Sequence, residues 1–398
     1  MKNRVAEHVA ALPKSGIRKF FDIVAQSKDI VSLGVGEPDF ATPWHISRAA
    51  VTCLENGGTH YTSNLGTPEL RQAICRYLER RFCAKFDWKC EVLATVGVSE
   101  AIDLAIRAIC SPGDEVLYHE PCFVSYAPTI RLAHAVPVCV ETRVEDEFRL
   151  TVDALEEKVT PWTKAILLNF PCNPTGATLS REDMAAILAF CEKHDLLLLA
   201  DEVYSELNYE IVDETDATSG TNGTLPSFAA FPEHRDRVIL LNGFSKSWAM
   251  TGYRLGYACG PTDVIDAMMK IHQYGIMSAP TLAQAAGVEA MDLGDKDVDR
   301  MRREYKKRRD WLVPVLNEMG LKTLMPKGAF YLFVDVRSTG LSDEEFALKL
   351  LKEFGVACVP GSAFGTCGAG FVRMSYATSL DKIKLAASRI AKMLKSIS

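Results

Sequence analysis

Three short polar groups of residues each follow an apolar stretch of the chain. Asn173 follows KAILLN, Asp201 with Tyr204 follows DLLLLA, and Ser245 with Lys246 follows RVILLN. Apolar runs of this length, bounded by turn residues, predict buried strands. Because ligands bind at the carboxyl ends of the strands in open α/β sheets, we expect the three groups to converge on one site.

Asp201 and Lys246 carry the charges of this predicted site. Asp201 directly follows four leucines and an alanine, where a carboxylate without a partner is costly to bury. It therefore either caps the start of a helix or holds a protonated pyridine nitrogen, which makes that ring an electron sink. Lys246 lies between Phe244 and Trp248, where loss of hydration lowers the pKa of an amine and frees a nucleophile; an exposed lysine is the alternative.

Two stretches can hold an anion beside this amine. Ser245, Arg254 and two nearby glycines combine a hydroxyl, a bidentate donor and room for close backbone approach, as in a phosphate clamp. Upstream, VLATVGVSEAIDLAIRAI predicts a strand, a turn at Gly97 and a helix that begins near Ser99. A helix start offers free backbone N–H groups and a positive dipole end. Simple capping by Ser99 is the alternative, and both interpretations can hold together.

The composition points to a globular protein that acts on small molecules. The chain has 398 residues, 48% hydrophobic and 24% charged, and a formal net charge of −6, which disfavours a nucleic-acid surface. Its 12 cysteines form no C-x-x-C pair and lack a histidine at metal-ligand spacing, so we expect reduced thiols and no metal site. The N-terminus lacks a signal-peptide core and no run approaches the ~18 apolar residues of a membrane span, so we expect a cytoplasmic protein without a membrane partner.

The order of elements predicts an α/β fold with two domains and an N-terminal arm. Six strand candidates alternate with helical stretches, which is typical of a mostly parallel sheet sandwiched by helices: 91–96, 114–119, 135–140, 164–169, 195–200 and 237–242. We expect the large domain at 46–285 and a smaller α+β domain at 286–398, with residues 1–45 packing on the latter. The segment 215–227 is predicted to be a mobile loop, and RREYKKRRD (302–310) a solvated helix face.

Seven motifs, in order along nearly the whole chain, resemble the class I/II aminotransferases, pyridoxal 5′-phosphate enzymes with the aspartate-aminotransferase fold (fold type I). They are SLGVGEPDF, YTSNLGTPELR, PCNPTG, DEVY, FSKSWAMTGYRLGY, KGAFYLF and GFVRMSYA. Within this family the chain is most similar to the aromatic, broad aspartate-type and N-acetyl-diaminopimelate aminotransferases; IRKFFDIVAQ and DEVYSEL also suit the last of these.

The resemblance implies roles for the residues around the cofactor ring. Lys246 matches the lysine that forms the Schiff base with pyridoxal phosphate and then moves the proton between Cα and the cofactor's C4′. Asp201 matches the partner of the pyridine nitrogen. Asn173 and Tyr204 match the donors to the ring's phenolic oxygen, and Phe123, in PCFVSY, matches the aromatic residue that stacks on the ring.

The resemblance also implies a phosphate site, a carboxylate site and a shared dimer. The phosphate is assigned to Ser245, Arg254 and the amides of Val98, Ser99 and Glu100. Arg373, in FVRMSY, matches the arginine that binds the substrate α-carboxylate, with Asn173 and Gly36 beside it. Tyr61, in HYTSNLG, matches a tyrosine that reaches the cofactor phosphate of the other subunit, so a homodimer is expected.

The predicted reaction is transfer of the α-amino group of an L-amino acid to a 2-oxo acid such as 2-oxoglutarate. Relatives specific for dicarboxylates place an arginine or lysine against the distal carboxylate, whereas this chain has Ser99 at the lysine position and no arginine in HQYGIMSAPT. We therefore expect aromatic or broad donor specificity, with N-acetyl-LL-diaminopimelate or aspartate as alternatives. A β-lyase shares the same framework. Two alternatives belong to other functional classes. One is a serine hydrolase, although GVSEA lacks the last glycine of the G-x-S-x-G motif. The other is a catalytically silent, cofactor-binding module of a transcription regulator.

Overall fold

A computed structural model of the chain describes residues 4–12, 29–210 and 224–397. Most of the predicted mobile loop at 215–227, and the whole of IRKFFDIVAQ (17–26), lie outside the described residues. Within the described ranges, no helix is both long and apolar enough to cross a membrane.

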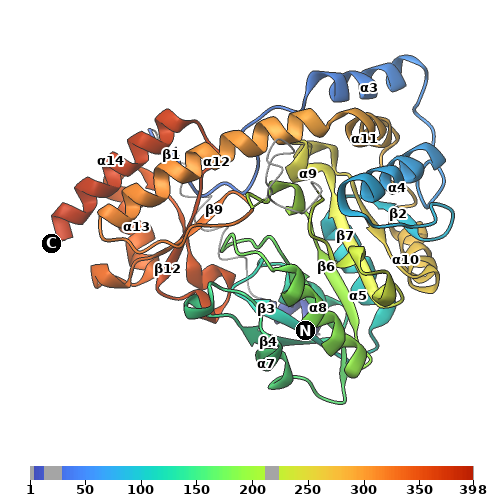
Figure 1. The fold of residues 1–398 in the computed structure, drawn as a ribbon, viewed down its shortest axis with the longest axis horizontal. Helices are drawn as coiled ribbons and strands as arrows, with labels where there is room; N and C mark the ends of the chain where they lie inside the picture. The colour runs from blue at the N-terminus through green and yellow to red at the C-terminus, as the bar shows by residue number, and fades with distance from the viewer. Residues whose placement is uncertain (1–3, 13–28, 211–223, 398) are drawn as a thin grey trace.

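A seven-stranded sheet carries the polar groups predicted to form the site (Figure 1). Its strand order is β2 (Val92–Thr95), β8 (Gly256–Cys259), β7 (Val238–Gly243), β6 (Leu197–Asp201), β5 (Thr163–Asn169), β3 (Glu115–Glu120) and β4 (Val136–Glu141). Neighbouring strands are parallel except where β8 pairs antiparallel with β2 and β7. The mostly parallel sheet is thus confirmed. β8 is missing from the predicted strands because its four residues adjoin the stretch assigned to the anion clamp.

Helices bury both faces of this sheet, which explains why its strands read as continuous apolar runs. In β5, Ile166 and Leu168 pack in the cluster of α8, whereas Ala165 and Leu167 pack in the cluster of α5 and α10. One face is covered by α5 (Val98–Ile109), α6 (Tyr126–Leu132) and α10 (Thr262–Gly275), and the other by α4 (Pro68–Phe82), α7 (Val152–Glu156), α8 (Arg181–Lys193) and α11 (Thr281–Leu293). Helix α3 (Trp44–Glu55) packs on α11.

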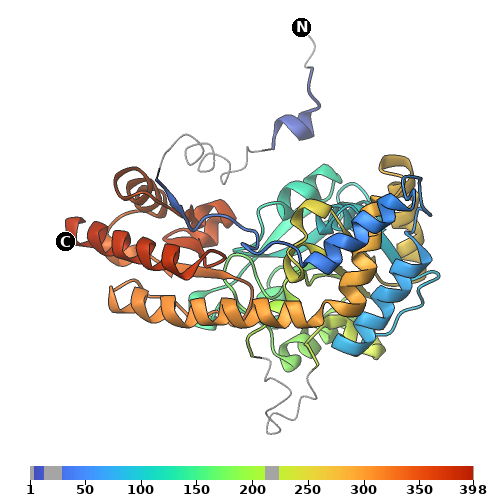
Figure 2. The same cartoon turned by 90° about the horizontal axis from the view of Figure 1, so that it is seen from above.

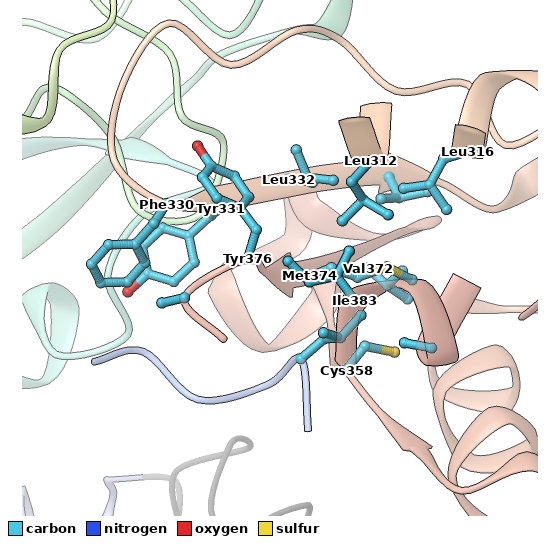
Figure 3. Packing of buried hydrophobic residues seen from close by; sticks show 14 of the residues in the cluster. Leu312, Leu316, Phe330, Tyr331, Leu332, Cys358, Val372, Met374, Tyr376 and Ile383 are labelled. Atoms are coloured by element: carbon cyan, nitrogen blue, oxygen red, sulfur yellow. The ribbon is translucent and has the colours of Figure 1, made fainter. Parts of the chain in front are cut away.

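A second core lies among the C-terminal elements. Three antiparallel strands, β11 (Val359–Pro360), β12 (Phe371–Ser375) and β9 (Tyr331–Asp335), pack with α12 (Asp295–Glu318), α13 (Asp343–Phe354) and α14 (Leu380–Ile397). Figure 3 shows Leu312 and Leu316 of α12 beside Leu332, with Val372, Met374 and Ile383 below them completing the apolar interior. The short strand β1 (Val31–Ser32) pairs with β10 (Val356–Ala357). The proposed domain boundaries at 45/46 and 285/286 stay a prediction.

Helix α12 links the two cores. In Figures 1 and 2 it runs from α11, beside the large sheet, to α14. The predicted solvated face along this helix is wrong for part of its arginines. Arg302 is buried and pairs with Asp299, and Arg308 is buried and pairs with Asp39. Asp39 lies outside the helix, so the Arg308 pair ties α12 to a distant segment. Asp299 lies on α12 itself, and Arg302 reaches its surroundings by donating to the carbonyl oxygen of Glu206 at 3.5 Å. The small helix α1 (Glu7–Ala10) contacts α6.

Candidate active site

A cavity of about 610 Å³ opens at the carboxyl ends of β5, β6 and β7. It is lined by eleven of the residues assigned from the sequence: Gly36, Val98, Ser99, Phe123, Asn173, Asp201, Tyr204, Ser245, Lys246, Arg254 and Arg373. Glu100 and Tyr61 are not among the lining residues. The volume lies in the ~300–1,000 Å³ range of sites that enclose small molecules.

Lys246 projects into this cavity from α9 (Phe244–Ser247), the short helix that directly follows β7. Its Nζ donates a hydrogen bond of 2.8 Å to the carbonyl oxygen of Gly36. Burial is the main cause that lowers the pKa of Lys246 to about 8; the positive charges of Arg373 and Arg254 act in the same direction, and the negative charge of Glu37 opposes them. An amine with this pKa is deprotonated in an appreciable fraction of molecules near neutral pH, so it can act as a nucleophile or a base.

Asp201 ends β6 at the floor of the cavity. Its carboxylate accepts hydrogen bonds from the Tyr126 hydroxyl, at 2.6 Å, and from the Val203 amide, at 3.3 Å. Asp201 caps no helix; the 3₁₀ turn that follows begins after Tyr204, so the capping alternative is wrong. Burial raises the pKa of Asp201 to about 6, although Tyr126 and the Val203 amide oppose this rise. A cationic ligand group beside Asp201 would remove much of the cost of its charge.

Because Asp201 is buried, we expect the free energy of unfolding to depend on pH. Because the folded pKa of Asp201 exceeds the ordinary value of 3.8, its contribution to stability is full below about pH 4 and is lost as pH rises through about 6. In protein freed of small ligands, Asp201→Asn should gain about 3 kcal/mol relative to wild type across this window. Urea unfolding at several pH values measures the difference. The same change at Asp266, an exposed aspartate on α10, should show no such slope; equal slopes would contradict the assignment.

Arg373 lies in the middle of β12 and is buried without a carboxylate partner among the described residues. Its Nη1 donates to the side-chain oxygen of Asn173 at 2.9 Å, and its Nη2 donates to the carbonyl oxygen of Gly34 at 2.7 Å. The guanidinium lies between the rings of Tyr331 and Phe364, 4.5 and 4.8 Å from their centroids. Its Nε has no hydrogen-bond partner. A planar cation held in this way suits a ligand carboxylate.

Asn169 and Tyr331 support these groups, and the sequence motifs did not assign them a role. The Asn169 side chain donates to the carbonyl oxygen of Asp201 and accepts from the amide of Asn173, at 2.9 Å in both cases. The hydroxyls of Tyr204 and Tyr331 are 2.8 Å apart. Asn169 ends a predicted strand and Tyr331 lies within KGAFYLF, but only the fold shows that they contact the site. Tyr126 was missed for the same reason.

The start of α5 and Arg254 form the anion-binding end of the cavity. The helix begins at Val98, and its N-cap is Gly97, at a φ of +76° and without a side-chain cap, so capping by Ser99 is wrong. A Cβ on Gly97 would lie 2.6 Å from Arg254 Nη2, so only glycine lets the guanidinium approach the turn. The first amides of a helix have no partner within it. With the Ser245 hydroxyl they present a concentrated set of donors to an anion.

Glu100 and Tyr61 lie away from the cavity wall. The Glu100 carboxylate accepts from the Val96 amide and lies 2.8 Å from Nδ1 of His272. His272 therefore partners Glu100 rather than Ser99, which gives no support to a serine nucleophile. Tyr61 is 83% exposed. The roles assigned to the Glu100 amide and to Tyr61 stay predictions.

The donor set of the cavity fits one kind of ligand. A phosphate suits the start of α5, an aromatic ring with a basic nitrogen suits Phe123 and Asp201, an aldehyde suits the amine of Lys246, and a carboxylate suits Arg373. Pyridoxal phosphate with an amino acid carries all of these groups. The unpaired Nε of Arg373 and the raised pKa of Asp201 are what such ligands would satisfy.

Comparison with known proteins gives the same answer over the whole chain. Residues 28–390 match the family model described as aminotransferase class I and II. The chain is 44% identical to an aspartate aminotransferase of Pyrococcus abyssi, covering 96% of both chains, and 42% identical to aromatic-amino-acid aminotransferase 2 of Thermococcus litoralis, covering 98% of both. A crystal structure of an aromatic aminotransferase from Pyrococcus horikoshii superposes with a TM-score of 0.88 at 43% identity, covering 95% of this chain and 99% of the other. The chain therefore belongs to the class I and II aminotransferases, enzymes that use pyridoxal 5′-phosphate to move an amino group from an amino acid to a 2-oxo acid.

Proposed function

We propose that this aminotransferase accepts a broad range of L-amino acids, aromatic ones included, and passes the amino group to 2-oxoglutarate or a similar 2-oxo acid. The observation that carries the proposal is the set of cations in the cavity. The cationic side chains among the described lining residues are Lys246, Arg254 and Arg373. Each of them is needed in transamination whichever amino acid is the donor. The other lining residues include Ser99, the apolar side chains of Val35 and Ile102, and the acidic Glu37, so a distal carboxylate finds no dedicated cation among them.

The cofactor is held by residues at both ends of the cavity in this proposal. Pyridoxal phosphate supplies, when bound, an electron sink in conjugation with the substrate Cα. Asp201 keeps the charge on the ring nitrogen, and Phe123 packs on the ring. The phosphate is held by Ser245, Arg254 and the amides of Val98, Ser99 and Glu100. Asn173 and Tyr204 bind the oxygen substituent of the ring, and the Tyr331 hydroxyl orients Tyr204.

Substrate is positioned by Arg373, and its proton is moved by Lys246. The fork of Arg373 binds the α-carboxylate bidentately and so sets which bond at Cα is aligned for cleavage. The lack of a side chain at Gly36 lets its backbone lie close to Tyr331 and Arg373. A Cβ there would lie 3.0 Å from the Tyr331 hydroxyl and 3.7 Å from Nη2 of Arg373. Lys246, free once substrate has displaced it, takes the Cα proton at Nζ, and the Gly36 carbonyl oxygen holds this amine in place.

A panel of single amino acids tests the proposed specificity. Purified holoenzyme is mixed with each donor, and the cofactor spectrum and the released 2-oxo acid are followed. We expect kcat/KM for aromatic donors to equal or exceed that for aspartate. A preference for aspartate or for N-acetyl-LL-diaminopimelate by more than ~10²-fold would replace broad specificity with that alternative. Release of pyruvate with thiol or ammonia would indicate a lyase.

We also propose a homodimer in which Tyr61 reaches the partner's site. Large side chains exposed on this chain support an interface: Trp44 is 72% exposed, Tyr61 83% and Tyr274 88%. Sedimentation should give about twice the chain mass of 43.9 kDa. Tyr61→Phe should weaken cofactor binding without changing that mass. A monomer with full activity would contradict the shared site.

A cytoplasmic location is part of the proposal. All 12 cysteines lie in the described part of the chain and all are free thiols. Free thiols in this number are typical of reducing compartments. Cell fractionation with an antibody against the chain would test the location.

A further inference from the structure

Outside the active-site cavity, the described residues contain one cluster with the side chains of a metal site. Glu120 ends β3, Cys139 lies in β4, and Cys367 lies in the 3₁₀ helix η8 (Thr366–Gly368). The two sulfur atoms and a carboxylate oxygen all lie within 4.8 Å of one another. Each of the three residues is half-buried, so an ion can reach them from solvent. None of them lines the active-site cavity.

The fold brings these residues together from segments more than 200 residues apart. Parallel pairing of β3 with β4 aligns Tyr118 with Cys139 and Glu120 with Glu141. The turn that contains Cys367 then closes over the end of β3, where the Thr366 amide donates to Glu120 Oε2 at 2.9 Å. Gly365, at a φ of +119°, makes this approach possible, because a Cβ there would lie 2.2 Å from the same oxygen.

The Glu120 carboxylate is also oriented from its other side. The Tyr118 hydroxyl donates to Oε1 at 2.7 Å. Hydrogen bonds to a ligating carboxylate are usual in metal sites, where they fix the orientation of the ligand. Two sulfurs and one oriented oxygen are therefore in place before any ion binds.

We propose that Glu120, Cys139 and Cys367 bind one divalent cation of the zinc class. Tetrahedral zinc has Zn–S distances of ~2.3 Å and Zn–O distances of ~2.0–2.2 Å, which places its ligand atoms ~3.5–4 Å from one another. The observed separations fall within reach of this geometry. Thiolates exclude magnesium and calcium. The ion forms bonds to two sulfurs and one oxygen, two thiol protons leave to solvent, and water occupies the fourth position.

The site would join the large sheet to the C-terminal elements. β4 is an edge strand of the sheet, on the opposite edge from β2. Cys367 belongs to the turn that leads into β12, and the amide of Cys122, two residues after Glu120, donates to the carbonyl oxygen of Phe364 at 3.1 Å. An ion at this junction crosslinks segments distant in sequence, so it should raise the midpoint of thermal unfolding.

Zinc binding to the reduced, metal-free, full-length holoenzyme tests the proposal. Competition against a chromophoric chelator should give one tight zinc site per chain, and calorimetry in two buffers should give about two protons released per ion. Zinc X-ray absorption should show two sulfur ligands at ~2.3 Å and oxygen at ~2.0–2.2 Å. Tyr118→Phe should weaken binding by ~10-fold, and Cys139→Ser or Cys367→Ser by more than that.

Matched variants separate the site from adventitious binding and from misfolding. Cys83→Ser removes an exposed cysteine outside the cluster and should bind zinc as wild type does. Cys367→Ser changes a surface turn, so its unfolding midpoint without zinc should equal that of wild type while the rise with zinc is lost. Zinc bound equally well by both cluster variants, or a zinc spectrum without sulfur, would overturn the proposal. The proposal would also be overturned if Cys139 and Cys367 form a disulfide, seen as a mass lower by two hydrogens, and the reduced protein binds no zinc.

Discussion

Lys246→Ala is expected to lower turnover of every amino donor by at least ~10⁴-fold. The amine is the one lysine nitrogen among the described residues that line the cavity, and its pKa of about 8 suits proton transfer near neutral pH. Its removal takes away both the group that bonds the cofactor and the group that moves the Cα proton. Steady-state kinetics with one good donor measure the loss, and borohydride reduction with peptide mapping should place the cofactor on Lys246 in wild type.

Two controls test whether the loss of turnover is specific to the amine of Lys246. Lys270→Ala removes an exposed lysine that pairs with Asp266 on α10, and its turnover should stay within about twofold of wild type because exposed pairs contribute little. Small primary amines added to Lys246→Ala should restore part of the rate, since they can occupy the space of the lost side chain and accept the proton. Near-normal turnover of the variant, or cofactor reduced onto another lysine, would remove Lys246 from its role.

Arg373→Lys should lower kcat/KM by ~10²–10³-fold although it conserves the charge. A lysine cannot keep the contacts to both Asn173 and Gly34 and also bind a carboxylate with two parallel hydrogen bonds. Losing one partner of a buried, hydrogen-bonded charge pair costs ~2–5 kcal/mol, which is the source of this range. We expect a rise in KM from weaker carboxylate binding and a fall in kcat from poorer alignment of the Cα bond.

An amine that lacks the α-carboxylate provides the sharpest control for Arg373. Such an amine should react slowly and at the same rate in wild type and Arg373→Lys, because it has no α-carboxylate for residue 373 to bind in either protein. Arg337→Lys, at an exposed arginine that pairs with Asp335, should leave kcat/KM unchanged. Equal losses with the amine and the amino acid would mean that the substitution damages the fold of β12 rather than substrate binding.

Much of the large sheet could be predicted from local patterns. Strands buried on both faces must be apolar at nearly every position, and all six predicted runs form strands with ends shifted by at most two residues. β8 escaped because Gly256–Cys259 is short and adjoins the anion clamp. Eleven residues assigned by motif line one cavity; Asn173, Asp201 and Lys246 follow predicted strand ends, whereas Arg373 lies within β12 and was assigned from the resemblance alone.

Residues whose role depends on a distant partner could not be found in this way. Tyr126 reaches Asp201 from α6, and Tyr331 reaches Tyr204 from β9. Nothing near either tyrosine in the chain indicates the contact. The expected absence of a metal site followed from spacing along the chain, whereas Glu120, Cys139 and Cys367 meet only because β3, β4 and η8 pack together.

The sequence by itself determined the α/β class, the strand ends that carry the polar groups, and the chemistry of amine, carboxylate and guanidinium. These follow from local periodicity and residue type, which act over a few neighbouring residues. The tertiary structure alone decided the partners: the carbonyl of Gly36 for Lys246, the hydroxyl of Tyr126 for Asp201, and the carboxylate of Asp39 for Arg308. Burial sets the charge states of such groups, and burial depends on which distant segments pack around them.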